Sequence, residues 1–112
     1  MKVLFVCAGN LCRSPFAEGL ARRLAAERGL DVEFASAGEI ALDGDRCPPD
    51  AVAAAREHGV DLSSHRARCL TTAHDADKVV PLFDVPDPLG RGRAAYRVTY
   101  ERLREKVEEL LA

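Results

Sequence analysis

Apolar residues along this chain alternate between short continuous runs and helical spacing. Residues 3–6 predict a strand buried on both faces of a parallel sheet. The segment from Pro15 onward predicts an amphipathic helix, because Pro suits the first helical position and Ser14 suits the N-cap. One face of this helix carries the apolar residues Phe16, Leu20, Ala21 and Leu24. The chain therefore opens with a strand, a tight loop and a helix.

The rest of the chain repeats this alternation. Residues 32–36 predict a second strand, and residues 49–58 predict an alanine-rich helix closed by Gly59. Residues 76–83 predict a third strand, which Pro81 restricts to a sheet edge or ends. The final helix carries an apolar stripe of Tyr96, Tyr100, Leu103, Val107, Leu110 and Leu111. A chain of 112 residues is expected to form a single α/β domain over residues 1–112.

The loop between the first strand and the first helix has the residues of an anion site. Cys7 and Arg13 lie at its ends with five residues between them. A loop at a helix N-terminus turns backbone N–H groups inward and adds the positive end of the helix dipole. Gly9 permits a tight turn, and Asn10 tolerates left-handed geometry. Arg13 can bind two phosphate oxygens, and the same field favours a thiolate nucleophile at Cys7.

The segment Cys7-x-Gly9-Asn10-x-Cys12-Arg13-Ser14-Pro15 resembles the signature loop of the low-molecular-weight protein tyrosine phosphatases. The resemblance implies a cysteine-dependent phosphatase in which Cys7 attacks phosphorus and forms a phosphocysteine intermediate. Arg13 and the backbone amides of the loop would bind the phosphoryl oxygens. The implied phosphate-binding residues are Ala8, Gly9, Asn10, Leu11, Cys12, Arg13 and Ser14. The resemblance implies no metal and no other cofactor.

Two later segments also resemble the family. They are Ser36-Ala37-Gly38, after the second strand, and His65-x-Ala67-Arg68, after the second helix. In relatives, a network of Asn, Ser and His side chains beneath the loop holds the Asn backbone in its strained conformation. The resemblance assigns this supporting network to Asn10, Ser14, Ser36 and His65. The alternatives are a surface position for His65 and an alignment that replaces Ser36 with Ala37.

The turn-rich segment before the final helix offers a general acid. A leaving alkoxide or phenoxide departs more readily when it is protonated, and a carboxylic acid can supply that proton and then act as a base on water. The segment Asp87-Pro88-Leu89-Gly90 resembles the acid loop of the family, which assigns this role to Asp87. Asp84 is the local competitor, and a purely turn-forming role is the alternative for Asp87.

The chain is shorter than the family pattern before this acid loop. Relatives pass from their third strand through another helix and a fourth strand, whereas residues 79–82 here lead almost directly to Asp87. We therefore expect a compact variant that lacks roughly one βα unit. The resemblance implies a three-layer αβα sandwich with three parallel strands in the order 2-1-3, a fourth strand being the alternative. The new sheet edge would need cover from the final helix or from a second copy, so a homodimer is predicted.

The residues define the substrate less narrowly than they define the reaction. Relatives that act on phosphotyrosine carry aromatic residues where this chain has Leu89 and, approximately, Leu42. Leu11 is apolar and favours a phosphate ester over phosphoarginine, although residues 95–99 resemble the phosphoarginine subgroup. The expected ligands are a phosphorylated protein, with phosphotyrosine first, or a small phosphomonoester, and phosphate or another oxyanion in the loop. The alternatives are arsenate reduction on the same fold, with Phe83 where reductases place a cysteine, and phosphate binding without turnover.

Composition and charge disfavour other classes. A net charge of −2 with 30% charged residues gives no reason to expect nucleic acid or an anionic membrane surface. No apolar run reaches membrane-spanning length and no signal-peptide pattern is evident, so a cytoplasmic protein is expected. The four cysteines are expected to be thiols, and they lack the two close pairs typical of structural zinc. Cys12 is a candidate redox partner that protects Cys7 through a reversible disulfide, with simple packing as the alternative.

Overall fold

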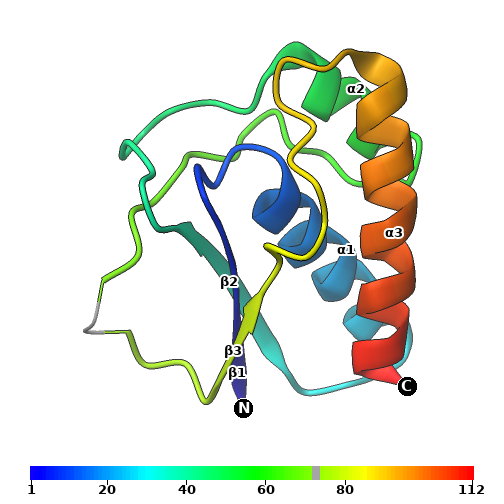
Figure 1. Cartoon of the computed structure of the whole chain (residues 1–112). Coiled ribbons are helices and arrows are strands. Elements are labelled where there is room, and N and C mark those ends of the chain that lie inside the picture. Colours follow the sequence, from blue (N-terminus) through cyan, green and yellow to red (C-terminus); the bar gives the residue numbers. More distant parts are fainter. Residues whose placement is uncertain (72–73) are drawn as a thin grey trace.

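The computed structural model describes residues 1–71 and 74–112 (Figure 1). Strands and helices alternate along these residues as the hydrophobic pattern predicts. In chain order they are β1 (Lys2–Cys7), α1 (Arg13–Glu27), β2 (Glu33–Gly38), α2 (Pro49–Arg56), β3 (Lys78–Pro81) and α3 (Arg93–Leu111). None of the helices in the described part of the chain is long and apolar enough to cross a membrane.

The strands form one parallel sheet in the order β2-β1-β3. Cys7 at the end of β1 pairs with Gly38 at the end of β2, and Val6 pairs with Pro81 at the end of β3. This confirms the predicted α/β class, the parallel sheet and the order 2-1-3, and no fourth strand occurs in the described residues. β1 is the central strand. Its carboxyl end lies at the end of the sheet where ligands bind in open α/β folds.

The three helices pack on one face of the sheet (Figure 1). Val3 and Phe5 of β1 belong to the same buried core as apolar side chains from all three helices. The α1 and α3 members of that core include the predicted residues Phe16, Leu20, Leu24, Tyr96, Tyr100, Leu103 and Val107. The rings of Phe16 and Tyr100 stack with their centroids 4.1 Å apart. This contact fixes α3 against α1 and so places the N-terminal half of α3 behind the loop that follows β1.

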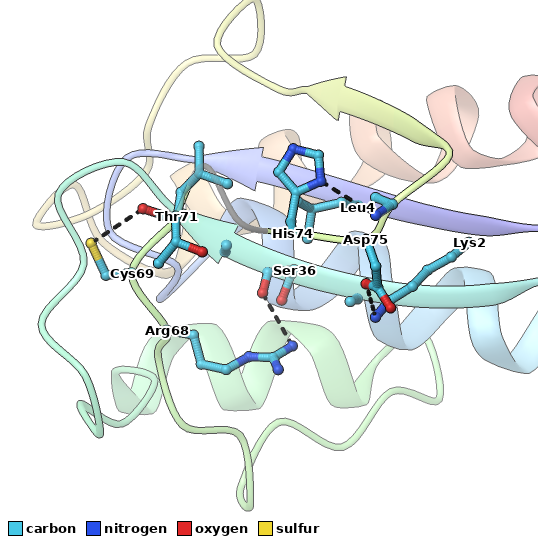
Figure 2. A pocket seen from close by; sticks show the side chains of 12 residues that line it. Lys2, Leu4, Ser36, Arg68, Cys69, Thr71, His74 and Asp75 are labelled. Atoms are coloured by element: carbon cyan, nitrogen blue, oxygen red, sulfur yellow. Dashed lines mark hydrogen bonds and ion pairs between the residues drawn. The ribbon is translucent and has the colours of Figure 1, made fainter.

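The opposite face of the sheet is covered differently from the prediction. Its small apolar cluster of Leu4, Val6, Ala35 and Ala37 is packed by Leu70 and Ala76. A cavity of about 260 Å³ lies between the sheet and this segment (Figure 2). The predicted sandwich had helices on both faces, but the third layer is irregular chain in its described parts. The physical reason is the composition of residues 66–77, which carry few apolar side chains at helical spacing.

The first helix begins two residues earlier than predicted. α1 starts at Arg13, and Cys12 occupies the N-cap position without a side-chain cap hydrogen bond. Ser14 was predicted as the N-cap but lies in the first turn, with its Oγ 2.9 Å from Cys7 Sγ. The Ser14 hydroxyl is engaged inside the molecule, so it does not cap the helix.

Candidate active site

Hydrogen bonds to its carbonyl groups shape the loop between β1 and α1. The carbonyl of Cys7 accepts a bond from the Glu39 N–H, and that of Ala8 accepts one from the Ile40 N–H, both at 3.0 Å. A trans peptide points its N–H opposite to its C=O. These two bonds therefore turn the N–H groups of Ala8 and Gly9 away from residues 39–40, which follow β2. The loop presents backbone donors beside the N-terminus of α1, which suits an anion.

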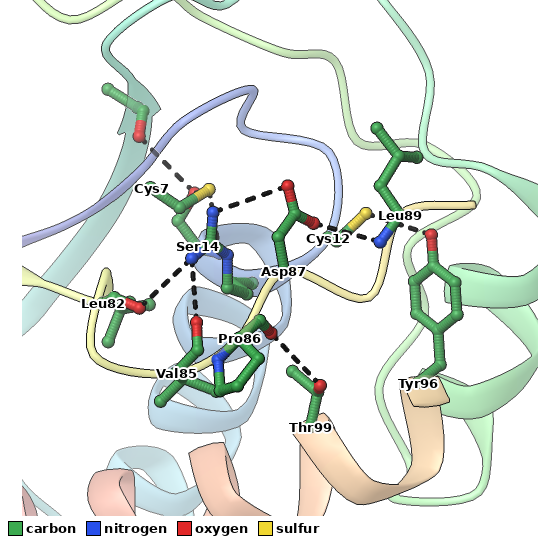
Figure 3. Close-up of polar contacts among 12 residues, drawn as sticks. Cys7, Cys12, Ser14, Leu82, Val85, Pro86, Asp87, Leu89, Tyr96 and Thr99 are labelled. Carbon is green, nitrogen blue, oxygen red and sulfur yellow. Dashed lines mark hydrogen bonds and ion pairs between the residues drawn. The ribbon is translucent and has the colours of Figure 1, made fainter. Parts of the chain in front are cut away.

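Cys7 is the last residue of β1, and its thiol lies beneath the start of α1. The side chain is buried. Its Sγ lies 2.9 Å from Ser14 Oγ and accepts a bond from the Ser14 N–H at 3.4 Å (Figure 3). A thiolate can only accept hydrogen bonds, so both Ser14 groups are placed to donate to it. The geometry suits a sulfur that carries negative charge.

Gly38 allows the loop to lie directly against the end of β2. A Cβ atom at this position would lie 2.5 Å from the Ala8 carbonyl oxygen and 2.7 Å from the Asn10 nitrogen. These are backbone atoms, which cannot swing aside as a flexible side chain can. The close approach therefore requires glycine.

Asn10 is fully buried and joins the loop to three other segments. Its φ of 55° lies in the left-handed region, which Asn tolerates better than most residues. Its Nδ2 donates to Ser14 Oγ at 2.7 Å and to Ser36 Oγ at 2.9 Å. Its Oδ1 accepts from the Arg68 N–H at 2.9 Å and lies 3.2 Å from His65 Nε2. The structure brings together all four residues of the predicted supporting network.

His65 contacts both oxygens of Asn10. Its Nε2 lies 3.0 Å from the Asn10 backbone oxygen and 3.2 Å from Oδ1. Both oxygens are acceptors, so Nε2 must carry the proton that it donates. Burial lowers the pKa of His65 below its ordinary value, against the opposing effect of the bond to Asn10. His65 is half-buried and holds the Asn10 backbone, rather than lying free on the surface.

Glu18 extends this network, and the sequence reasoning missed it. Ser36 Oγ donates to Glu18 Oε1 at 2.5 Å, and Glu18 Oε2 pairs with Arg22 Nη1 at 2.8 Å. The Glu18 side chain is only 11% exposed. The sequence does hold a signal, because Ser14, Glu18 and Arg22 are spaced four residues apart and so share one side of α1.

Arg13 connects the loop after β1 with the segment after β3. It is buried at the N-terminus of α1. Its Nη1 donates to the Val85 carbonyl at 2.9 Å and, more weakly, to the Leu82 carbonyl at 3.5 Å. Its Nη2 lies 3.7 Å from Asp87 Oδ2 (Figure 3). The guanidinium therefore contributes both to a positive cradle and to the position of the acid segment (residues 84–90).

The acid segment reaches the cradle although the chain is short. Val85 is buried, and Thr99 Oγ1 of α3 donates to the Pro86 carbonyl at 3.3 Å (Figure 3). Asp87 uses its two oxygens differently. Oδ1 accepts from the Leu89 N–H at 3.0 Å, which is a turn contact, while Oδ2 faces Arg13. The turn that was the alternative role for Asp87 thus aims its other oxygen at the site.

Cys7, Arg13 and Asp87 line one small cavity of about 20 Å³. Its other lining residues are Gly9, Leu11, Cys12 and Leu89. A thiol, a guanidinium and a carboxyl group therefore share one space, with two leucines at its border. Over residues 1–71 and 74–112, no group of three His, Cys, Asp or Glu side chains is arranged to hold a metal ion.

Asp84, the competitor for the acid role, lies elsewhere. Its Oδ2 is 2.5 Å from Lys106 Nζ on α3. The hydrogen bond from Lys106 lowers the pKa of Asp84 below its ordinary value. Asp84 does not line the cavity, which leaves Asp87 as the carboxyl group beside Cys7.

Cys12 packs between the loop and α3. Its Sγ lies 3.1 Å from the Tyr96 hydroxyl, and its carbonyl accepts a bond from the Tyr100 hydroxyl at 2.9 Å. Burial raises the pKa of the Cys12 thiol to about 11. Cys7 and Cys12 are both free thiols. These contacts support the packing role for Cys12, and its redox role stays a prediction.

A family model described as low molecular weight phosphotyrosine protein phosphatase matches residues 2–82. The probable low molecular weight protein-tyrosine-phosphatase EpsP of Ralstonia solanacearum is 48% identical over 69 residues, which are 62% of this chain and 45% of that protein. The chain therefore spans about half the length of that relative.

A second relative aligns along nearly its whole length. The glutaredoxin arsenate reductase of Synechocystis is 30% identical over 132 aligned positions, which cover 99% of this chain and 96% of that protein. The alignment is longer than the 112 residues of this chain. The relative thus carries extra residues inside the aligned region, in agreement with the expected compact variant.

The fold agrees with a solved structure as well. YwlE arginine phosphatase, in a Cys-to-Ser variant with a phosphorylated active-site serine, is 30% identical with a TM-score of 0.91 over 98% of this chain and 93% of its own. The family model covers most of the chain, and the loop of residues 7–14 lies where such a fold binds an anion. This chain belongs to the low molecular weight phosphotyrosine protein phosphatase family.

Proposed function

We propose that the chain is a cysteine-dependent phosphatase that hydrolyses phosphomonoesters through a phosphocysteine intermediate. The observation that carries this proposal is the shared cavity of Cys7, Arg13 and Asp87. Each of the three supplies a different part of the chemistry: a nucleophile, an oxyanion clamp and a proton donor.

In the first step, the Cys7 thiolate attacks phosphorus and forms an S–P bond. The bond from phosphorus to the leaving oxygen breaks, and Asp87 transfers its proton to that oxygen. The Asp87 side chain is 45% exposed and sits at the mouth of the cavity. A leaving group that extends outward from a phosphate in the cradle would therefore meet this carboxyl group.

In the second step, water attacks the phosphocysteine. Asp87, now a carboxylate, takes a proton from that water, the S–P bond breaks, and the thiolate and phosphate are regenerated. The relative with a phosphorylated serine in its active site supports a residue of this loop as the phosphoryl acceptor. Ser14 Oγ, 2.9 Å from Cys7 Sγ, can donate to the departing thiolate in this step.

The cradle favours the transition state over the bound substrate. Three equatorial oxygens gain charge density as the phosphoryl group transfers. Preorganised backbone N–H groups and a buried guanidinium stabilise that charge without reorganising. Arg13 is held by the Val85 carbonyl before any ligand arrives, so its position needs no ordering.

We propose phosphotyrosine in a protein as the substrate, with a small phosphomonoester as the wider class. Leu11 and Leu89 border the cavity, and an apolar border suits an aryl or alkyl ester better than a charged guanidino group. Phosphoarginine is the competing substrate, because the YwlE relative is an arginine phosphatase. Equal initial rates on a phosphotyrosine peptide and a phosphoarginine peptide would contradict the assignment.

Arsenate reduction has weaker support. One relative is an arsenate reductase, but such chemistry needs further thiols that carry a disulfide outward. Cys12 is buried with a raised pKa, and Phe83 lies two residues beyond the end of β3. No accessible thiol among the described residues lines the cavity with Cys7.

Hydrolysis of para-nitrophenyl phosphate by wild type and by Cys7→Ser tests the function. We expect turnover in wild type, loss of turnover in the variant, and inorganic phosphate binding in both. Unchanged turnover in Cys7→Ser would refute the nucleophile. Phosphate binding without turnover in wild type would replace the phosphatase with a binding module.

A homodimer remains our prediction for the assembly. β3 is an edge strand whose Val79 is 42% exposed. Beside it lies a cavity of about 270 Å³, lined by apolar side chains such as Val80 and Leu110 and by the charged Lys78 and Glu109. Opposite charges on one border are self-complementary across a two-fold axis, so a second copy is the partner that this edge suits.

A further inference from the structure

We propose that Glu18 is a positioning residue for Cys7 and acts through the hydroxyl of Ser36. This inference rests on the proposed function in one respect only, namely that Cys7 is the reactive group. It adds to the site a residue, Glu18, that does not itself line the cavity of Cys7, Arg13 and Asp87.

The placement of Glu18 is unusual for a helical glutamate. Its side chain is 11% exposed, and both carboxylate oxygens are engaged. The pair with Arg22 is a common i,i+4 contact, but the 2.5 Å bond from Ser36 is not local, since 18 residues separate the partners. Burial of a carboxylate is costly unless its contacts offset the loss of hydration.

The hydrogen bonds from Glu18 to Cys7 have one consistent direction. The Glu18 carboxylate can only accept, so Ser36 Oγ–H points to it and leaves its lone pairs for Asn10. The Asn10 amide then directs one N–H to Ser36 and the other to Ser14. With an N–H already pointing at its oxygen, the Ser14 hydroxyl has its own hydrogen to donate, and Cys7 Sγ at 2.9 Å is a nearer acceptor than the Ala37 carbonyl at 3.5 Å.

The contacts of the Asn10 side-chain oxygen are consistent with this direction of the hydrogen bonds. Its Oδ1 receives the Arg68 N–H and faces His65 Nε2. Without Glu18, the Ser36 hydrogen is free to turn toward Asn10 and to compete with the Asn10 N–H. The hydroxyl of Ser14 then loses its fixed orientation, and the thiolate loses a donor.

A purely electrostatic role predicts the opposite sign. Removal of a negative charge near a thiolate makes the thiolate easier to form and therefore faster to alkylate. Loss of an oriented donor makes the thiolate harder to form and slower to alkylate. The sign of the change in Cys7 reactivity at constant pH therefore separates the two accounts.

The experiment is a double-mutant cycle of Glu18→Leu and Ser36→Ala. The rate of Cys7 carboxymethylation by iodoacetate at pH 7 is followed by mass spectrometry of its peptide, together with kcat and KM. We expect each single variant to react on the order of tenfold more slowly, with kcat reduced and KM little changed. In the Ser36→Ala background, Glu18→Leu should have no further effect.

Glu27→Leu is the matched control, because Glu27 on the same helix forms an exposed i,i+4 pair with Arg23. It should alkylate at the wild-type rate. Additive effects of Glu18→Leu and Ser36→Ala, or faster alkylation, would overturn the proposal. If Glu18→Leu fails to fold, Glu18→Met, which also lacks an oxygen acceptor, replaces it in the same cycle, and an effect that persists in the Ser36→Ala background is again contrary. Failure of turnover in wild type would affect the phosphatase proposal but not the alkylation cycle.

Discussion

At the scale of single residues, Asp87 illustrates how one side chain serves two purposes. One carboxylate oxygen binds the Leu89 N–H and fixes the turn, and the other faces Arg13 across the cavity. The turn contact limits the rotation of the carboxyl group. The orientation that the proposed acid role needs is thus supplied locally, by the residue two positions later.

We predict that Asp87→Asn slows the hydrolysis of phosphate esters, and slows it most for esters whose leaving group needs protonation. An amide cannot give a proton to the leaving oxygen, so phenyl phosphate should lose on the order of 10²–10⁴ in kcat/KM, which reports the first step alone. Loss of the base in the second step lowers kcat for both esters, so the comparison between them uses kcat/KM. Para-nitrophenyl phosphate should lose much less, because its leaving group needs little protonation. Steady-state rates on both esters provide the measurement. Asp84→Asn is the control and should leave both rates within about twofold, since Asp84 lies at Lys106; equal losses in the two variants would contradict the assignment.

His65 predicts a pH dependence of stability. Burial holds its folded pKa below the ordinary value of 6.5, so the unfolded chain binds more protons in the interval between the two values. The stability from neutral His65 is present above about pH 6.5 and is lost as the pH falls through the folded pKa. Urea midpoints at pH 7.5 and 5.5 should show a drop in wild type that is smaller in His65→Asn. A drop of the same size in both chains would exclude His65 as its source.

The motif residues could be proposed from the sequence because each lies in a short segment whose residue types and spacing indicate a chemical role. Cys7, Arg13 and Asp87 stand in short segments whose residue types have a direct chemical use. Glu18 could not be assigned in the same way, since its partner Ser36 lies on a different element. Only the packing of α1 against β2 reveals that a polar stripe on a helix faces a buried hydroxyl.

At the scale of elements, the end of β2 and the loop after β1 form one unit. Gly38 N–H donates to the Arg68 carbonyl at 2.9 Å, while the Gly38 backbone touches Ala8 and Asn10. Three segments therefore meet at a residue without a side chain.

We predict that Gly38→Ala displaces the phosphate loop. Its Cβ would overlap backbone atoms at 2.5 Å, and overpacking of this kind costs about 1–3 kcal/mol. The melting temperature should fall by several degrees and the affinity for inorganic phosphate by tenfold or more, as measured by calorimetry. Gly9→Ala serves as the comparison for stability, because a Cβ there meets only Leu11 side-chain atoms at 3.8 Å; an equal loss of stability in both would contradict the steric argument.

Element order could be predicted from hydrophobic periodicity and sheet order from the family resemblance, but two features could not be predicted. The predicted start of α1 is wrong because Ser is a favoured N-cap residue, whereas in the fold the Ser14 hydroxyl contacts Cys7 Sγ. The third layer was misplaced because family likeness implied helices on both faces, whereas residues 66–77 lack the apolar spacing to form one. In the first case a long-range contact outweighs local propensity, and in the second the local pattern outweighs the family resemblance.

At the scale of the whole molecule, the acid segment (residues 84–90) is held in place by side chains of α1 and α3. Arg13 binds it from the cradle and Thr99 binds it from α3. These two contacts hold the segment from both of its sides. The shortening of the chain before this segment leaves β3 at an open edge.

We predict concentration-dependent dimerisation through that edge. Sedimentation velocity should show a dimer at high protein concentration, and Val79→Lys should abolish it, because a charge at an edge strand opposes pairing. Catalytic rates per chain should not change. A clean monomer of the wild-type chain at high concentration would remove the dimer.

The Asn10 side chain has a consequence for folding. It hydrogen-bonds to α1, to β2 and to the segment of residues 65–68, so the anion cradle exists only when parts far apart in the sequence have already assembled. An unfolded or half-folded chain cannot bind the ligand. Phosphate at a hundred times its dissociation constant would therefore stabilise the native state by about 2.7 kcal/mol. Bound phosphate would then also lower the population of the unfolded chain that a protease can cleave.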